Sequence, residues 1–161
     1  MIGYVQVDGA PGESHDAGHK DWIKLLSVSE SVTRPVMSKG TTTATDRATL
    51  GDVVITKLTD KSSPKLYEFT TTGKSINKIT IDLVTSIGAG TETTFLKITL
   101  ENVIVSSFHL EGVDEGHHLP KERVALNFRK IKIEYWPHDK AGTKGGVVET
   151  SWDTGENKKA G

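Results

Sequence analysis

Metal coordination is the first chemistry that the residue types of this chain would allow. His15 and His19 have the four-residue spacing by which a helix presents two ligands to zinc, but they lie in a polar, glycine-flanked stretch without a helical face. A catalytic zinc site also needs three rigidly held ligands. We therefore predict no metal and no other cofactor, and histidines that lie in solvated loops. The six histidines are His15, His19, His109, His117, His118 and His138. His117 and His118 lie close in sequence to Asp114 and Glu115.

The sequence also gives little support for a nucleophilic, phosphate-binding or acid–base site. The chain has no cysteine and no GxSxG turn. The glycine-rich stretches 88–90 and 142–146 lack the Lys-Ser/Thr that completes a phosphate loop. The carboxylates of Asp8, Glu13 and Asp16 cluster early in the chain, but no apolar residues surround them to make one carboxyl group retain its proton. We predict that the protein is not an enzyme.

Three tryptophans could line a sugar-binding surface. Trp22, Trp136 and Trp152 each stand within, or at the end of, a segment that alternates like a β-strand. Such positions favour packing in the core or between subunits. A monomeric carbohydrate-binding barrel is the alternative that these residues leave open.

Length and charge narrow the class of protein. At 161 residues the chain is expected to form one domain, residues 1–161. Twenty basic and 21 acidic residues give a net charge of −1, which argues against binding to nucleic acid or to membrane surfaces. No apolar run approaches the roughly 20 residues that span a bilayer, and the first residues, 1–4, lack the pattern of a signal peptide. We expect folding in the cytoplasm.

The stretch that must form a helix lies between two strand-like segments. Ser63 is a candidate helix cap, Pro64 presets the first helical dihedral angle, and Gly73 is suited to the left-handed closing position. Leu66 and Phe69 have the spacing of one buried face. The sequence predicts one short helix, at about 63–72, that packs against a sheet.

The remaining segments predict strands. In two long ones, the apolar alternation changes phase near Asn102 and near Arg129-Lys130, where we predict bulges of the kind that bend a sheet into a barrel. The expected fold is mainly β, a β-barrel of two packed antiparallel sheets with the helix outside. The predicted strands are 2–8, 22–32, 53–58, 76–85, 94–108, 122–136 and 147–152.

Two segments contribute little to a core. The loop at about 34–50 is rich in Thr, Ser and Ala, and it is either a surface loop or an arm that docks on a neighbour. The segment at about 154–161 is predicted to be a flexible tail.

Taken in order, four segments resemble the Hcp family, the tube proteins of the bacterial type VI secretion system. They are GESHDAGHKDWIKLLSVSESV (12–32), DVVITKLTDKSSPKLYEFTTTGKSINKITIDL (52–83), FLKITLENVIVSSF (95–108) and VALNFRKIKIEYW (124–136). The resemblance implies a structural subunit that forms hexameric rings, which stack and carry effector proteins in their lumen. It also implies sheath and tip-spike proteins as partners, and release from the cell without a cleaved signal peptide.

The loop at 34–50 is where the family's rings would meet. The loop is otherwise dominated by small, uncharged residues. We predict that its charged residues Arg34, Lys39, Asp46 and Arg47 contribute to the stacking of rings. A tube subunit of a phage-like contractile injection device would have the same kind of fold and ring assembly, and the sequence leaves that alternative open.

Overall fold

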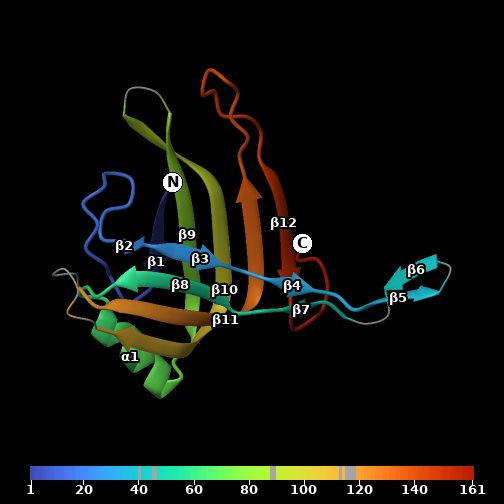
Figure 1. Ribbon diagram of the computed structural model, residues 1–161, viewed down its shortest axis with the longest axis horizontal. Helices are drawn as coiled ribbons and strands as arrows, with labels where there is room; N and C mark the ends of the chain where they lie inside the picture. Colours follow the sequence, from blue (N-terminus) through green and yellow to red (C-terminus); the bar gives the residue numbers. More distant parts are fainter. Residues whose placement is uncertain (40, 45–46, 88–89, 113, 115–118) are drawn as a thin grey trace.

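Most of the chain forms one antiparallel sheet that curls into a nearly closed barrel (Figure 1). This computed structural model describes residues 1–39, 41–44, 47–87, 90–112, 114 and 119–161. The predicted mainly β barrel with one outer helix is confirmed, although one continuous sheet replaces the two packed sheets that we expected. Around the barrel the strands are β2 (Ile23–Leu25), β1 (Ile2–Val7), β9 (Ile76–Ile87), β10 (Thr91–Glu111), β11 (Lys121–Tyr135), β8 (Val53–Leu58) and β3 (Ser27–Ser29), with β12 (Val148–Asp153) beside β11.

The segment 23–29 closes the barrel because it pairs with both ends of the sheet. Its first part, β2, pairs with β1, and its second part, β3, pairs with β8. Leu26 stands between the two parts, and its amide donates a 2.8 Å hydrogen bond to the Thr56 carbonyl oxygen. Each of the two closing ladders therefore includes only three residues of this segment.

The phase changes in β10 and β11 have a different cause from the predicted bulges. Asn102 adopts a left-handed conformation with φ 51°. The pairs on either side of it, Glu101 with Lys130 and Val103 with Phe128, keep the same register. Both strands change phase at facing positions, so neither needs an extra residue there. The register shifts of β10 lie at 105–107 and 94–96 instead.

The helix α1 (Ser63–Thr72) lies on the outside of the sheet, near the lower edge in Figure 1. Leu66 and Phe69 are buried, as their spacing predicts, and Gly73 ends the helix at φ 65°. The predicted cap is wrong: Ser63 is the first helical residue, and its hydroxyl accepts a hydrogen bond from the Asp60 amide.

A buried ion pair fastens α1 to the sheet. Lys57 of β8 and Glu122 of β11 are fully buried, with Nζ 2.7 Å from Oε2. Lys57 also binds Asp60 at 3.0 Å and the Ser63 hydroxyl at 3.1 Å, while the Thr59 hydroxyl donates to Glu122. This network connects β8, β11 and the start of α1, and of its side chains the sequence had singled out only Ser63.

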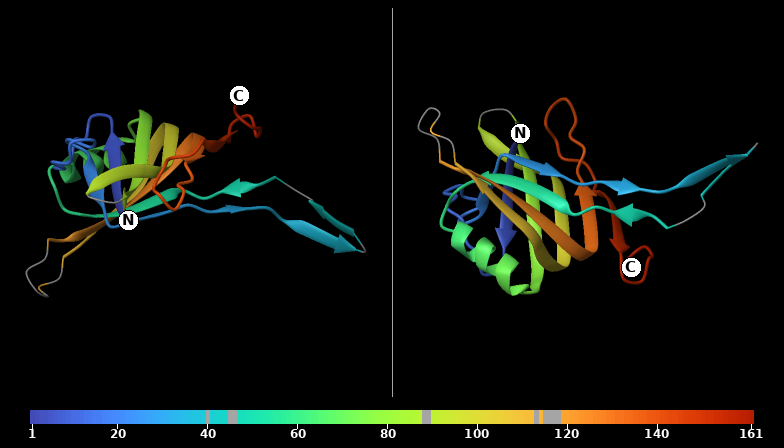
Figure 2. Two further views of the ribbon diagram at one scale, coloured as in Figure 1. Left: turned by 90° about the horizontal axis from the view of Figure 1, so that it is seen from above. Right: turned by 60° about the horizontal axis from the view of Figure 1, so that its bottom comes forward.

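The segment 32–50, hereafter the arm, projects from the barrel as a long two-stranded ribbon (Figure 2). Its strands are β4 (Val32–Thr33), β5 (Val36–Lys39), β6 (Thr41–Ala44) and β7 (Thr49–Leu50), with β4 paired to β7 and β5 to β6. The strand predicted for 22–32 is thus divided into β2, β3 and the beginning of the arm. The segment is an extended ribbon, and its docking on a neighbour stays a prediction.

The C-terminal residues run back beside β12. The Ala160 amide donates to the Ser151 carbonyl oxygen, the Ser151 hydroxyl donates to the Ala160 carbonyl oxygen at 2.7 Å, and Asp153 forms a bridge with Lys158. The flexibility that we expect of residues 154–161 stays a prediction. Within the described ranges, no helix has both the length and the apolar character needed to cross a bilayer.

Candidate functional site

The arm carries the residues that the sequence predicted for ring stacking. Arg34 follows β4 and Arg47 precedes β7, so they lie on the two opposing strands of the ribbon. Lys39 ends β5, but its side chain is outside the part that the structure describes, and Asp46 lies outside the described residues altogether. The structure therefore places two of the four charges on one projection.

Apolar side chains on the arm face solvent. Val32 is 63% exposed, Val36 65% and Met37 51%. Three exposed apolar side chains on a projecting element make the arm a candidate site of contact with another molecule.

Where the arm leaves the barrel, it covers a pocket of about 240 Å³. Val32 and Leu50 of the arm form one wall, and Ile133 and Trp152 of the barrel form the other. Glu30 and Arg34 line the same pocket. Glu30 was not predictable from the sequence, because its place beside this pocket depends on β11 and β12, which are about 100 residues away in the chain.

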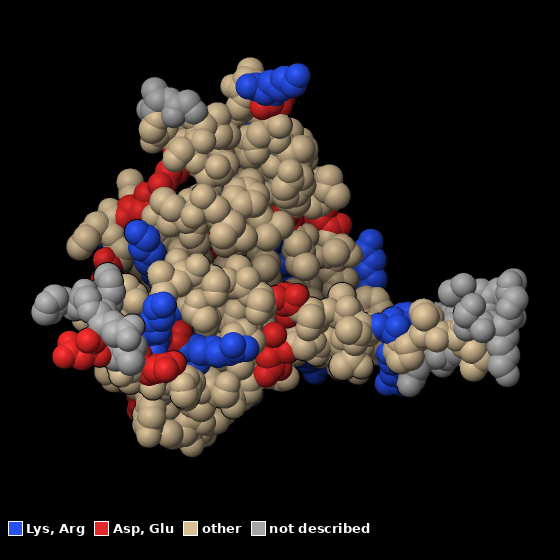
Figure 3. All heavy atoms as spheres, in the orientation of Figure 1, with Lys and Arg blue, Asp and Glu red and all other residues tan. Residues whose placement is uncertain are grey.

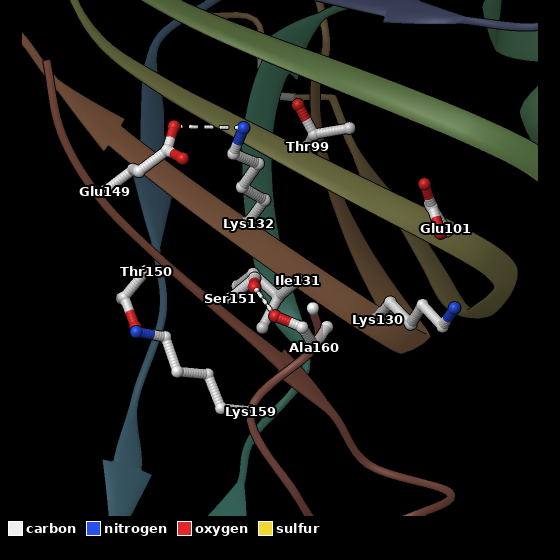
Figure 4. Close-up of a pocket in the computed structure, with 11 residues that line it drawn as sticks. Thr99, Glu101, Lys130, Ile131, Lys132, Glu149, Thr150, Ser151, Lys159 and Ala160 are labelled. Atoms are coloured by element: carbon white, nitrogen blue, oxygen red, sulfur yellow. Dashed lines mark hydrogen bonds and ion pairs between the residues drawn. The ribbon is translucent and has the colours of Figure 1, made fainter.

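A second, larger pocket of about 610 Å³ lies over β10, β11 and β12 (Figure 4). Its charged side chains have both signs. Lys132 lies 3.0 Å from Glu149 and 3.2 Å from Glu134, and the hydrogen bonds with these carboxylates, Glu149 first, raise the pKa of Lys132. In the space-filling view, too, basic and acidic groups are interspersed over the barrel (Figure 3). This balance suits contact with protein better than binding of a polyanion.

The histidine prediction fails at one position. His19 is buried, with Nδ1 2.7 Å from Asp16 Oδ1 and Nε2 3.0 Å from Asp82 Oδ2. Its ring stacks on Tyr4 at 4.4 Å and meets the edge of Trp22 at 4.8 Å. The neighbours of His19 come from β1 and β9 as well as from its own loop, so local sequence could not reveal this burial.

The other histidines do not form a metal site in the described part of the chain. His15 and His109 are exposed, as predicted, while His138 is partly buried and pairs through its backbone with Lys144. Glu115, His117 and His118 lie outside the described residues. Among the residues that are described, no three His, Asp or Glu side chains are arranged to hold a metal ion.

The early carboxylates have structural partners. Glu13 accepts a hydrogen bond from the Lys61 amide, and Asp16 is bound by His19. The hydrogen bond from His19 is the main reason that the pKa of Asp16 lies below its ordinary value of 3.8. These contacts hold the loop 12–21 against the barrel.

We predict that His19→Ala lowers the free energy of unfolding by about 2–3 kcal/mol, because it removes a stacked ring and leaves the buried Asp82 without that partner. Urea unfolding would measure the change. In the wild type, the lowered pKa of Asp16 stabilises the folded state at pH values above the ordinary pKa of this group. The stabilisation should be present above about pH 4, and it should be lost as the pH falls through the lower pKa that Asp16 has in the folded state. His15→Ala, in the same loop but exposed, should change stability by less than about 0.5 kcal/mol. Equal losses in the two variants would contradict this account.

The three tryptophans pack against different neighbours. Trp22 contacts His19, the Nζ of Lys144 lies 4.2 Å from the ring centroid of Trp136, and Trp152 lines the pocket below the arm. Each is partly buried. These contacts are those of packing residues and give the sugar-binding alternative no support.

Comparison with known proteins agrees with this geometry. The family model described as "Type VI secretion system effector, Hcp" matches residues 4–135. "Protein hcp1" of Pseudomonas aeruginosa is 29% identical over 159 residues, covering 98% of this chain and 97% of the relative. The "Major exported protein" of the same organism is 27% identical over 139 residues, covering 83% and 78%.

Solved structures show the same fold. One described as "a type six secretion system protein" has a TM-score of 0.92 at 28% identity and covers 99% of both chains. Hcp1 from Salmonella typhimurium has a TM-score of 0.77 at 24% identity and covers 99% of this chain and 98% of its own. The second likeness bears on the fold alone.

Proposed function

Because the chain belongs to the Hcp family of type VI secretion proteins, we propose that it is the subunit of the secretion tube. Members of this family are secreted, structural proteins and not enzymes. The proposal goes further: six copies form a ring, rings stack into a tube, and the lumen carries effector proteins. Sheath and tip-spike proteins are the proposed partners. The subunit would be made in the cytoplasm and leave the cell without a cleaved signal peptide.

The observation that carries this proposal is the arm. When a compact barrel carries a projecting ribbon, two copies can associate through different surfaces. The ribbon of one copy binds a receiving surface on the next. Such head-to-tail contacts generate closed rings or open stacks, depending on the rotation between copies. The exposed Val32, Val36 and Met37 give the ribbon an apolar surface that a neighbouring subunit could cover.

We further propose that the charges of the arm orient the stacked rings. Arg34 and Arg47 lie on the projection, and Lys39 and Asp46 belong to the same segment. A single exposed ion pair contributes little, but six equivalent contacts around a ring act together. The segment 34–50 would therefore set the register between rings.

Light scattering after size exclusion tests the ring. We expect a species of about six times 17.5 kDa, visible as rings in negative-stain micrographs, because head-to-tail contacts between the complementary flanks of neighbouring barrels close into a ring. A monomer at every concentration, without rings on the grid, would reject the proposal. The His15→Ala variant is a suitable control because that exposed side chain carries no part of the predicted contact.

A further inference from the structure

The arm meets the barrel at a narrow root. Only Glu30 and Ser31 separate β3 from β4, and only Gly51 and Asp52 separate β7 from β8. The Gly51 amide donates a 2.9 Å hydrogen bond to the Ser31 carbonyl oxygen, and a Cβ at position 51 would stand 2.7 Å from Ser31 Oγ. The two strands therefore contact each other at Ser31 and Gly51. Glu30 flanks this contact on one strand, and Asp52 flanks it on the other.

The pairing register changes across the root. Ser29 pairs with Val54 on the barrel side, and Val32 pairs with Leu50 on the arm side. One strand advances three residues between these pairs and the other advances four. Such an extra residue bends and twists a ribbon, so the root is the place where the direction of the arm is set.

Glu30 brings an unsatisfied carboxylate oxygen to this bend. Its Oε2 is buried and has no hydrogen-bond partner among the described residues. The walls of the pocket that Glu30 lines are mainly apolar, formed by Val32, Leu50, Ile133 and Trp152 together with Ile131. Burial raises the pKa of Glu30 to about 7; the Ser31 amide opposes this rise, and the charge of Asp52 adds to it.

The other charges near Glu30 come from the arm and from the strands packed beside it. Arg34 of the arm lines the same pocket. Asp52 precedes β8 and accepts hydrogen bonds from the Ser106 hydroxyl and the Asn127 amide. The pocket residues of β11 and β12 are uncharged, and the nearby Lys132 and Glu149 bind each other. Among these groups, Glu30 is the one with a buried side-chain oxygen that has no hydrogen-bond partner in the described residues.

We propose that Glu30 is a pH-responsive latch that controls how firmly the arm is held on the barrel. When protonated, its carboxyl group stays in the pocket and the arm root rests against β11 and β12. When ionised, it moves to water, because a charge on the buried Oε2, which has no partner among the described residues, is costly and because Asp52 repels it. The role of this latch in tube assembly rests on the proposed function, since the arm is the surface that would join rings.

The direction of the pH effect follows from the raised pKa. The folded state favours the protonated form of Glu30, so the stabilising contribution of this group is present below its ordinary pKa of 4.5. It is lost progressively as the pH rises from about 4.5 through about 7. The arm root should therefore be firm in mild acid and loose above neutrality.

Carbon NMR of the wild-type protein tests the titration without any variant. With carboxyl-labelled glutamate, the Glu30 signal should titrate with a midpoint near 7. A midpoint near 4.5, the ordinary value, would overturn the proposal. Because this measurement uses the unaltered chain, it does not depend on whether a substitution is tolerated.

Amide hydrogen exchange tests the mechanical consequence. The protection factor of the Gly51 amide, corrected for intrinsic exchange, should fall at least about tenfold between pH 5 and pH 8.5 in the wild type. In Glu30→Gln, whose neutral side chain imitates the protonated acid, it should stay constant. The exposed Glu101→Gln is the matched control and should behave like the wild type. The Gly12 amide, bonded to the Asp21 carbonyl oxygen away from the root, serves as the internal reference. An equal fall at Gly51 in Glu30→Gln would overturn the latch.

Sedimentation across the same pH range separates the latch from the proposed function. If Glu30 titrates near 7 and Gly51 responds but rings never stack at any pH, the latch is supported and the stacking proposal fails. If rings stack while Glu30 titrates near 4.5, the stacking proposal is supported and the latch fails.

Discussion

Replacing Glu122 by alanine should lower the free energy of unfolding by about 3–5 kcal/mol, the cost expected when one partner of a buried ion pair is removed. Lys57 and Glu122 are both fully buried, so the substitution leaves an ammonium group away from water. Asp60 and Ser63 still contact that group, but they cannot replace the carboxylate that lies 2.7 Å away. Urea unfolding monitored by circular dichroism would measure the loss.

A double variant distinguishes loss of the pair from loss of packing. Lys57→Met combined with Glu122→Leu removes both charges and fills the space with apolar atoms, so it should recover most of the stability. On the surface of α1, Lys65 and Glu68 form an ion pair at 3.0 Å with both side chains about half exposed. Lys65→Met should therefore change stability by less than about 1 kcal/mol. If Glu122→Ala cost no more than this control, the buried network would have no structural importance.

Removing the outer arm should abolish ring stacking and leave the barrel folded. In a variant with residues 35–48 replaced by two glycines, β5 and β6 are lost, and these strands pair only with each other in the described structure. The buried core has no member in that segment as far as it is described. We expect the melting temperature to change by only a few degrees, rings to persist in light scattering, and stacks in micrographs to fall at least about tenfold.

Charge reversal at one arm residue is a finer version of the same experiment. Arg47→Glu should reduce stacking and secretion because six altered contacts act together around a ring. Arg47→Lys keeps the positive charge and should retain most of the stacking and secretion. Normal secretion by Arg47→Glu would remove this residue from the stacking contact, whereas stacking by the shortened variant would remove the arm itself.

Local patterns in the sequence predicted much of the barrel. Leu66, Phe69 and Gly73 specify the helix through periodicity and backbone geometry, which depend on neighbours a few residues away. Alternation predicted the long strands for the same reason. The pairing of β2 and β3 with opposite ends of the sheet was not predictable in this way, because it depends on β1 and β8, which lie in two other parts of the chain.

The candidate site was less predictable, since its chemistry depends on long-range neighbours. His19 looks like a solvated loop histidine until β1 and β9 are placed around it. Glu30 looks like an ordinary surface acid until β11 and β12 form the pocket beside it. The exclusion of the arm from the core, by contrast, was open to prediction, because a run of small polar residues cannot form a core of its own.

The closing segment 23–29 also determines how the chain must fold. Its partner β1 pairs in turn with β9, more than 70 residues later in the chain, so the N-terminal strands have no place in the sheet until the middle of the protein has been synthesised. Topologies dominated by such distant pairing fold slowly, in milliseconds to seconds. During that interval the edges of β1 and β8 stay unpaired, and open strand edges are where nascent chains aggregate. For the tube subunit that we propose, we therefore expect the greatest tendency to aggregate before these two short ladders form.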